Sequence, residues 1–76
     1  MNAANLGQRL RARRQALGID QRTLAEIAGV SVHALSNLEG GTGNPTWALI
    51  SQVSAVLGLE LTLQIRTATV DQSVAP

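Results

Sequence analysis

Glycine divides this 76-residue chain into short segments, and this division restricts the fold to a set of brief helices. Gly18 and Gly29 each follow a stretch in which apolar residues recur every three or four positions, as they do on one face of a helix. Glycine adopts the left-handed backbone conformation at little cost, so it is common where a helix ends. The segment GGTGNPT at 40–46 is a loop by composition, and Gly58 follows the last helical stretch.

This pattern predicts four short helices, at about 5–17, 21–28, 32–38 and 46–57. Asp20 and Ser31 are the expected N-caps of the second and third helices, because their side-chain oxygens can accept N–H groups of the first turn. Asn44 or Thr46 can cap the fourth helix, and Pro45 stands where a helix start tolerates proline. The second and third helices are too short to be stable alone, so packing must hold them.

The apolar faces of these helices supply the expected core. Its predicted members in the last three helices are Leu24, Ala25, Ile27, Ala28, Leu35, Leu38, Trp47, Ile50, Val53 and Leu57. Trp47 is the only aromatic residue, and a tryptophan can stack on nucleic-acid bases. Its place at the head of an inward-facing stripe favours a core position instead.

Beyond Gly58 the periodicity changes to two, because LELTLQIR at 59–66 alternates apolar and polar residues. This alternation predicts a strand, and a lone strand leaves its backbone groups unpaired. We expect two copies to pair antiparallel about a twofold axis; the alternative is a segment that packs on its own helices. The predicted dimer interface consists of Leu49, Val56, Leu59, Leu61, Leu63 and Ile65. Residues 67–76 have the composition of a disordered tail.

Composition excludes several classes of protein. The chain has no cysteine for disulfides or thiolate metal sites, and no apolar run near the ~20 residues that a membrane span needs. One histidine and five scattered acids give no metal or acid/base pair, so we expect neither an enzyme nor a cofactor. All six basic residues are arginine, and five precede residue 23, which fits either a phosphate-facing surface or a solvated helix face.

The stretch QRTLAEIAGVSVHALSNLEGG at 21–41 has the helix, glycine turn and helix that lay one short helix in the DNA major groove. It resembles the helix-turn-helix of the Cro/CI (XRE) family, with the pattern Q-x-x-L-A-x-x-A-G-V-S-x-x-x-I/L-S-x-x-E-x-G, at nearly every patterned position. The resemblance covers 6–58 and implies a mainly α, lambda-repressor-like fold of four to five short helices.

The stretch SNLEGGTGNPTWALISQVSAVLGLELTLQI at 36–65 resembles HipB-like antitoxins, in which a C-terminal strand follows an XRE domain and pairs between subunits. This resemblance implies a DNA-binding domain at 1–58, a dimerisation strand at 59–66 and a tail at 67–76. It also implies a homodimeric repressor of the bacterial cytoplasm that binds double-stranded DNA at a palindromic operator, including its own. The alternative is an interaction module whose main partner is a HipA-like kinase toxin.

The resemblance makes 31–38 the recognition helix, with Val32, His33, Ser36 and Asn37 facing the base edges. Asn37 can make two bonds to adenine, His33 can donate to guanine or accept from an amino group depending on its tautomer, and Val32 can pack on a thymine methyl. Val32 departs from the polar residue more common there. His33 and Ser36 also have ordinary structural roles open to them, as a solvated side chain and a bond to the helix backbone.

The family pattern also implies residues that contact phosphates and one ion pair. The expected phosphate contacts are Gln21, Arg22, Ser31, Asn44 and Thr46. In the family the glutamine also often steadies a side chain of the recognition helix. Arg9 and Arg22 are supplementary candidates whose alternative is an ordinary solvated charge, an alternative that is favoured for Arg9. Arg14 lies on the apolar face of the first helix, where an unpaired charge is costly. In the family an arginine at this position meets a glutamate at the end of the third helix, here Glu39.

Overall fold

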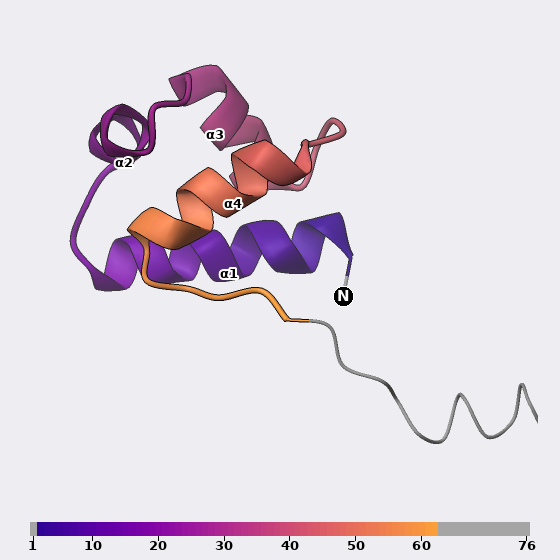
Figure 1. The fold of residues 1–76 in the computed structure, drawn as a ribbon, viewed down its shortest axis with the longest axis horizontal. Helices are drawn as coiled ribbons and strands as arrows, with labels where there is room; N and C mark the ends of the chain where they lie inside the picture. The colour runs from indigo at the N-terminus through magenta and orange to yellow at the C-terminus, as the bar shows by residue number, and fades with distance from the viewer. Residues whose placement is uncertain (1, 63–76) are drawn as a thin grey trace, which may run out of the picture.

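The computed structural model describes residues 2–62, which form four helices (Figure 1). These are α1 (Ala3–Ala16), α2 (Gln21–Ala28), α3 (Val32–Gly40) and α4 (Trp47–Val56). Each predicted helix is therefore confirmed, with its ends within two residues of the expected position. Within residues 2–62 there is no fifth helix and no strand, and none of the four helices is long and apolar enough to cross a bilayer.

Each helix begins at a polar side chain that accepts a hydrogen bond from the N–H group three residues ahead. The predicted caps Asp20 and Ser31 accept from Thr23 and Ala34 at 2.8 and 3.0 Å. Thr46, rather than Asn44, caps α4 and accepts from the Leu49 N–H at 3.1 Å. Such a cap contributes typically ~1 kcal/mol when its helix is short, so the caps fix where these helices begin.

The core lies where α1 packs against α3 and α2 packs against both α3 and α4. Its fully buried side chains are Leu10, Leu24, Leu35, Leu38, Val53 and Leu57. Burying each such side chain stabilises the fold by about 1.5–3 kcal/mol. The Arg13 side chain donates to the Leu57 carbonyl oxygen at 3.0 Å, which ties α1 to the end of α4.

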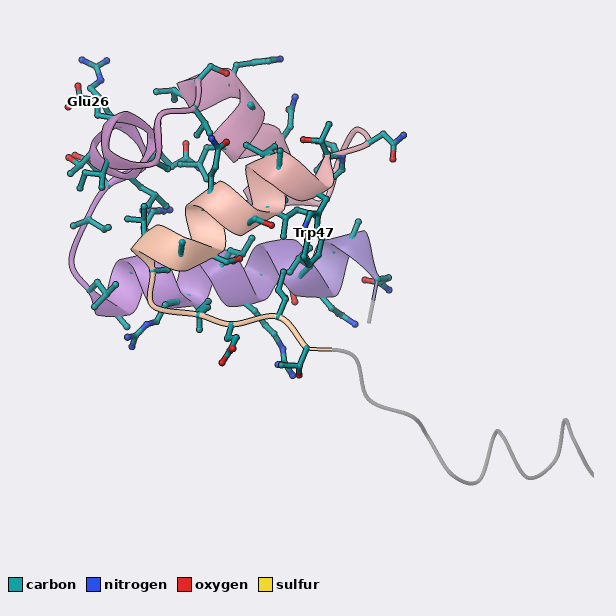
Figure 2. All side chains as sticks on the ribbon, in the orientation of Figure 1. Glu26 and Trp47 are labelled. Carbon is teal, nitrogen blue, oxygen red and sulfur yellow. The ribbon has the colours of Figure 1, made fainter. Side chains whose placement is uncertain are left out.

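Two residues predicted for the core are exposed, and both predictions are wrong. Ile27 is 61% exposed because the buried face of α2 is formed by Leu24, Ala25 and Ala28, and Ile27 lies roughly 100° round the helix from the centre of that face. Trp47 is 67% exposed because it is the first residue of α4, beyond the end of the core. Its side chain projects from α4 toward α1 (Figure 2).

After α4 the chain passes along α1 (Figure 1), and residues 59–62 form no strand. The Leu59 N–H donates to the Ser54 carbonyl oxygen at 2.9 Å, and the Leu59 side chain packs against the core. A strand ladder requires a second backbone beside this segment, and a single chain supplies none here. The rest of the predicted strand, with Leu63 and Ile65, and the predicted tail at 67–76 lie outside the described residues.

Gly7 allows α1 to approach the end of α3. A Cβ atom at this position would lie 2.5 Å from the Glu39 carbonyl oxygen and would also collide with the Leu38 carbonyl oxygen. We therefore expect Gly7→Ala to push α1 away from α3 and to lower the free energy of unfolding by more than ~2 kcal/mol, as measured by urea denaturation. Gly40→Ala is the matched control, because nothing lies closer than 4.0 Å to its Cβ atom and alanine favours a helix. Equal stabilities of the two variants would contradict this account of Gly7.

Candidate nucleic-acid interface

The turn between α2 and α3 consists of residues 29–31 and has a fixed shape. Gly29 ends α2 with φ of 72°, in the left-handed region, and the Val30 N–H donates back to the Ala25 carbonyl oxygen at 3.0 Å. Ser31 then caps α3 immediately. The two helices are consequently held across a short turn, with α3 packed on both α1 and α2 (Figure 1).

One face of α3 is anchored and the opposite face is open. Leu35, Leu38 and Glu39 are buried beneath the helix. The predicted base-reading residues lie on the other side: Val32 is 42% exposed, His33 and Ser36 are exposed, and Asn37 is half-buried. The structure thus gathers all four on one surface of a rigidly held helix.

Two of these side chains are linked to each other. The Asn37 amide nitrogen lies 3.3 Å from His33 Nε2, one turn earlier on α3. Thr42, which sequence analysis did not identify, donates its hydroxyl to the Asn37 carbonyl oxygen at 3.3 Å and toward Asn37 Oδ1 at 3.4 Å. The adjacent Gly41, which ends α3 in the left-handed conformation, is the sequence signal that indicates such a return of the chain.

Arg14 and Glu39 form a two-bonded ion pair beneath α3. Arg14 Nε lies 2.7 Å from Glu39 Oε2, and Arg14 Nη2 lies 2.9 Å from Glu39 Oε1. The residues are only 8% and 5% exposed, so their charges are largely removed from water. The hydrogen bonds that Arg14 donates to Glu39 raise the pKa of Arg14 above its ordinary value, against the opposing effect of burial. The pair therefore holds α1 to α3 with both partners charged.

Gln21 adds α2 to this pair, in the kind of contact with an α3 side chain that the family resemblance implies for this glutamine. Its Nε2 donates to Glu39 Oε1 at 3.1 Å, so Glu39 accepts bonds from side chains of both α1 and α2. Arg14 Nη1 also donates to the Ile19 carbonyl oxygen at 2.9 Å, in the segment between those helices. Glu39 is consequently the point at which the first three helices are fastened together.

The predicted phosphate contacts lie at the helix starts. Gln21 and Arg22 open α2, and Arg22 is exposed. Ser31 and Thr46 are exposed caps whose oxygens already accept backbone N–H groups. Asn44 and Thr46 line a shallow hollow beside α3 that Asn37 also borders. Arg9 lies elsewhere, in a groove between α1, α4 and residues 59–62.

That groove contains part of the predicted dimer interface. Its volume is about 730 Å³, and its lining includes Leu59, Leu61, Trp47 and Ile50. Leu61 is 36% exposed, and Ser54, which also lines the groove, has a buried hydroxyl with no hydrogen-bond partner among the described residues. Leu49 and Val56, the other predicted interface residues within the described part, are half-buried and pack partly on the core.

The Asp20 cap makes stability depend on pH. Its hydrogen bond from the Thr23 N–H lowers the pKa of Asp20 below the ordinary carboxyl value. Because the pKa of Asp20 is lower in the folded chain than in the unfolded chain, where it is about 3.9, the charged carboxylate stabilises the fold at pH values above about 3.9. This stabilisation is lost as the pH falls through the pKa of the folded chain. We expect the melting temperature of the native chain to fall relative to that of Asp20→Asn between about pH 5 and pH 2, because asparagine caps without titrating. A constant difference across that range would contradict a role for the charge.

Comparisons with known proteins agree with this geometry. A profile of the helix-turn-helix domain family matches residues 5–64. The crystal structure of the restriction-modification controller protein C.AhdI from Aeromonas hydrophila superposes with a TM-score of 0.71 at 33% sequence identity. The superposition covers 76% of this chain and 88% of that protein. No curated protein sequence matches significantly. With an anchored α3 presenting its polar face, these similarities establish that the chain belongs to the helix-turn-helix family of DNA-binding transcriptional regulators.

Proposed function

We propose that the chain is a homodimeric, sequence-specific transcriptional repressor that binds a palindromic operator, including one before its own gene. The observation that carries this proposal is the exposed face of α3, whose opposite side is fixed by Leu35, Leu38 and the Glu39 bonds. A helix held in this way can enter the major groove without rearranging. Burial of the anchor and exposure of the reading face are what this role requires.

The residues that contact the base edges are the four on the exposed face of α3: Val32, His33, Ser36 and Asn37. The Asn37 carboxamide has the donor and acceptor needed to pair with adenine N7 and N6. Val32, 42% exposed at the start of α3, offers methyl groups to a thymine methyl. His33 and Ser36 are exposed and add hydrogen bonds to neighbouring bases.

Contacts to the DNA phosphates fix the position of α3 relative to the base pairs. Gln21 uses one hydrogen of its amide for Glu39 and retains the second for a phosphate oxygen beside the start of α2. Arg22 adds a charge there, and the exposed Asn44 lies beside the start of α4. Because so few cations lie on this surface, we expect affinity to fall with salt less steeply than for lysine-rich DNA-binding proteins.

A second copy completes the binding unit. The groove between α1, α4 and residues 59–62 is apolar, open and bordered by the exposed Trp47 and Leu61. Pairing of the 59–66 segments of two copies would cover this groove and give the backbone groups of both segments hydrogen-bond partners. Two copies then place two α3 helices about one DNA turn, ~34 Å, apart.

Trp47 reports on this association directly, because it is the only aromatic residue of the chain. We expect its fluorescence emission to move to longer wavelength on dilution, as dimers dissociate and the indole returns to water. The same transition should appear as a halving of mass in sedimentation at matching concentrations. Emission that stays constant while the mass halves would place Trp47 outside the interface.

DNA binding itself is tested by fluorescence anisotropy with DNA from upstream of the protein's own gene. We expect Asn37→Ala to weaken operator binding about 30-fold or more, since a bidentate base contact is worth about 1–3 kcal/mol and the dimer loses one in each half-site, and to leave binding to scrambled DNA unchanged. Gln15→Ala, an exposed amide in the last turn of α1, serves as the control and should bind as the native chain does. Equal losses on operator and scrambled DNA would exclude Asn37 as a base reader.

Two narrower roles accompany this proposal. Similarity to the restriction-modification controller protein C.AhdI favours control of restriction and modification genes as a second candidate. Neutralisation of a HipA-like kinase toxin stays a prediction from the sequence resemblance. Co-purification of the tagged chain with the product of its neighbouring gene distinguishes the two, since a toxin partner would be retained in stoichiometric amount.

A further inference from the structure

We propose that Thr42, which lies outside α3, determines base specificity by fixing the orientation of the Asn37 carboxamide. This inference rests on the proposed function and names a positioning residue for it. The backbone already determines where Thr42 lies. Gly41 turns the chain with φ of 72°, and the Thr42 N–H then donates to the Asn37 carbonyl oxygen at 3.0 Å. The backbone turn at Gly41 therefore places residue 42 beside Asn37, whichever side chain residue 42 carries.

The threonine hydroxyl extends this backbone contact to the side chain. It lies 3.3 Å from the Asn37 carbonyl oxygen and 3.4 Å from Asn37 Oδ1, so its single proton is shared between two acceptors of the same residue. A valine at this position would retain the shape and the backbone bond but would lose the hydroxyl. The substitution Thr42→Val therefore removes the contact with the carboxamide and keeps the backbone bond that ends α3.

On its other side the Asn37 carboxamide meets His33. The Asn37 amide nitrogen can only donate, so at 3.3 Å it makes His33 Nε2 the acceptor and leaves the histidine proton on Nδ1. The carboxamide is consequently held at both ends, with its oxygen toward Thr42 and its nitrogen toward His33. Rotation by 180° would turn the carboxamide oxygen toward His33 Nε2, which would then have to carry the histidine proton.

This arrangement leaves one bonding position free on each end of the carboxamide. An amide oxygen accepts two bonds and an amide nitrogen donates two, and one of each is used here. The remaining acceptor and donor are those that pair with adenine N6 and N7. A carboxamide held in one orientation prefers adenine, whereas a freely rotating one also accommodates bases with the reverse order of donor and acceptor. His33 Nδ1–H is in turn left as a donor, which suits guanine rather than an amino group.

The test compares Thr42→Val and Thr42→Ser in the full chain against an operator obtained by selection from random DNA. At each base pair, affinities are measured for the operator and its three single-base changes. We expect Thr42→Val to reduce discrimination at one adenine position about five- to tenfold, with unchanged melting temperature, salt slope and affinity for random DNA. Thr42→Ser should restore the discrimination, because it restores the hydroxyl. Nitrogen NMR shifts of His33 should show the Nδ1–H form in the native chain and a mixture of tautomers in Thr42→Val.

Each contrary result has a distinct meaning. If Thr42→Val weakens binding to all sequences equally and reduces the salt slope, Thr42 contacts phosphate and the inference is wrong. If Thr42→Val discriminates as the native chain does, the hydroxyl does not orient Asn37 and the inference is wrong while the proposed function stands. If the native chain itself prefers no sequence, the proposed function fails and the inference fails with it.

Discussion

Replacing Glu39 with alanine is expected to lower the melting temperature by more than about 10 °C. Removal of one partner from a buried ion pair costs about 3–5 kcal/mol, and each kcal/mol lowers the melting temperature of a domain of this size by roughly 4–8 °C. Glu39 is 5% exposed and accepts bonds from both Arg14 and Gln21. Its loss leaves the Arg14 guanidinium buried without a counter-charge and releases both α1 and α2 from α3.

The matched control is Glu26→Ala, which removes the same side chain from the exposed surface of α2. Glu26 points away from the helices into solvent (Figure 2), so its loss should change the free energy of unfolding by less than about 0.5 kcal/mol. Thermal melting followed by circular dichroism measures both variants. A double substitution of Arg14 and Glu39 should be less destabilising than the sum of the two single changes. If Glu39→Ala melts as Glu26→Ala does, the ion pair does not hold α3 in place.

Replacing Leu61 with glutamine is expected to shift the dimer toward monomers by about 10²-fold or more in dissociation constant. Leu61 borders the apolar groove and is 36% exposed in the single chain. Because only about a third of the side chain is left to bury, leucine burial at the interface contributes about 0.5–1 kcal/mol per copy. Burying an unpaired glutamine carboxamide in its place costs a further ~1–3 kcal/mol, and twofold symmetry counts each change twice, so the combined loss is about 3–8 kcal/mol. Operator affinity should fall with it, because binding by two linked copies exceeds binding by one about 10²–10⁴-fold.

Ile27→Gln provides the control for this experiment. Ile27 is also an exposed aliphatic residue, at 61%, but it lies on α2 and not in the groove. Sedimentation equilibrium over a range of concentrations should find Leu61→Gln largely monomeric and Ile27→Gln associated like the native chain. If Leu61→Gln dimerises as strongly as the native chain, the interface lies on another surface.

The helices were predictable because local chemistry sets their limits. Asp20 and Ser31 cap in place, and Gly29 ends α2 where the apolar period breaks, so sequence and structure agree there. Trp47 and Ile27 were misplaced because periodicity identifies an apolar face but does not show where the neighbouring helices end. Whether an apolar residue at the edge of a stripe is covered depends on packing between helices distant in sequence.

The bonds around the candidate site were less predictable for the same reason. The family pattern indicated Arg14 and Glu39, but the bond from Gln21 to Glu39 depends on how α2 lies against α3. The contact between Thr42 and Asn37 depends on the turn that Gly41 makes after α3. A strand at 59–66 would require the backbone of a second chain beside it, which the alternation of apolar and polar residues does not specify.

Selection of bound sequences from a random DNA pool tests most directly whether α3 reads DNA as half of a symmetric pair. Successive rounds with the native chain should enrich an inverted repeat whose half-sites are centred about 10 base pairs, or a multiple of one turn, apart. Asn37→Ala should relax the preference at one symmetric pair of positions and leave the spacing unchanged. A pool that remains random after selection, or that enriches a single unrepeated site, would contradict the account.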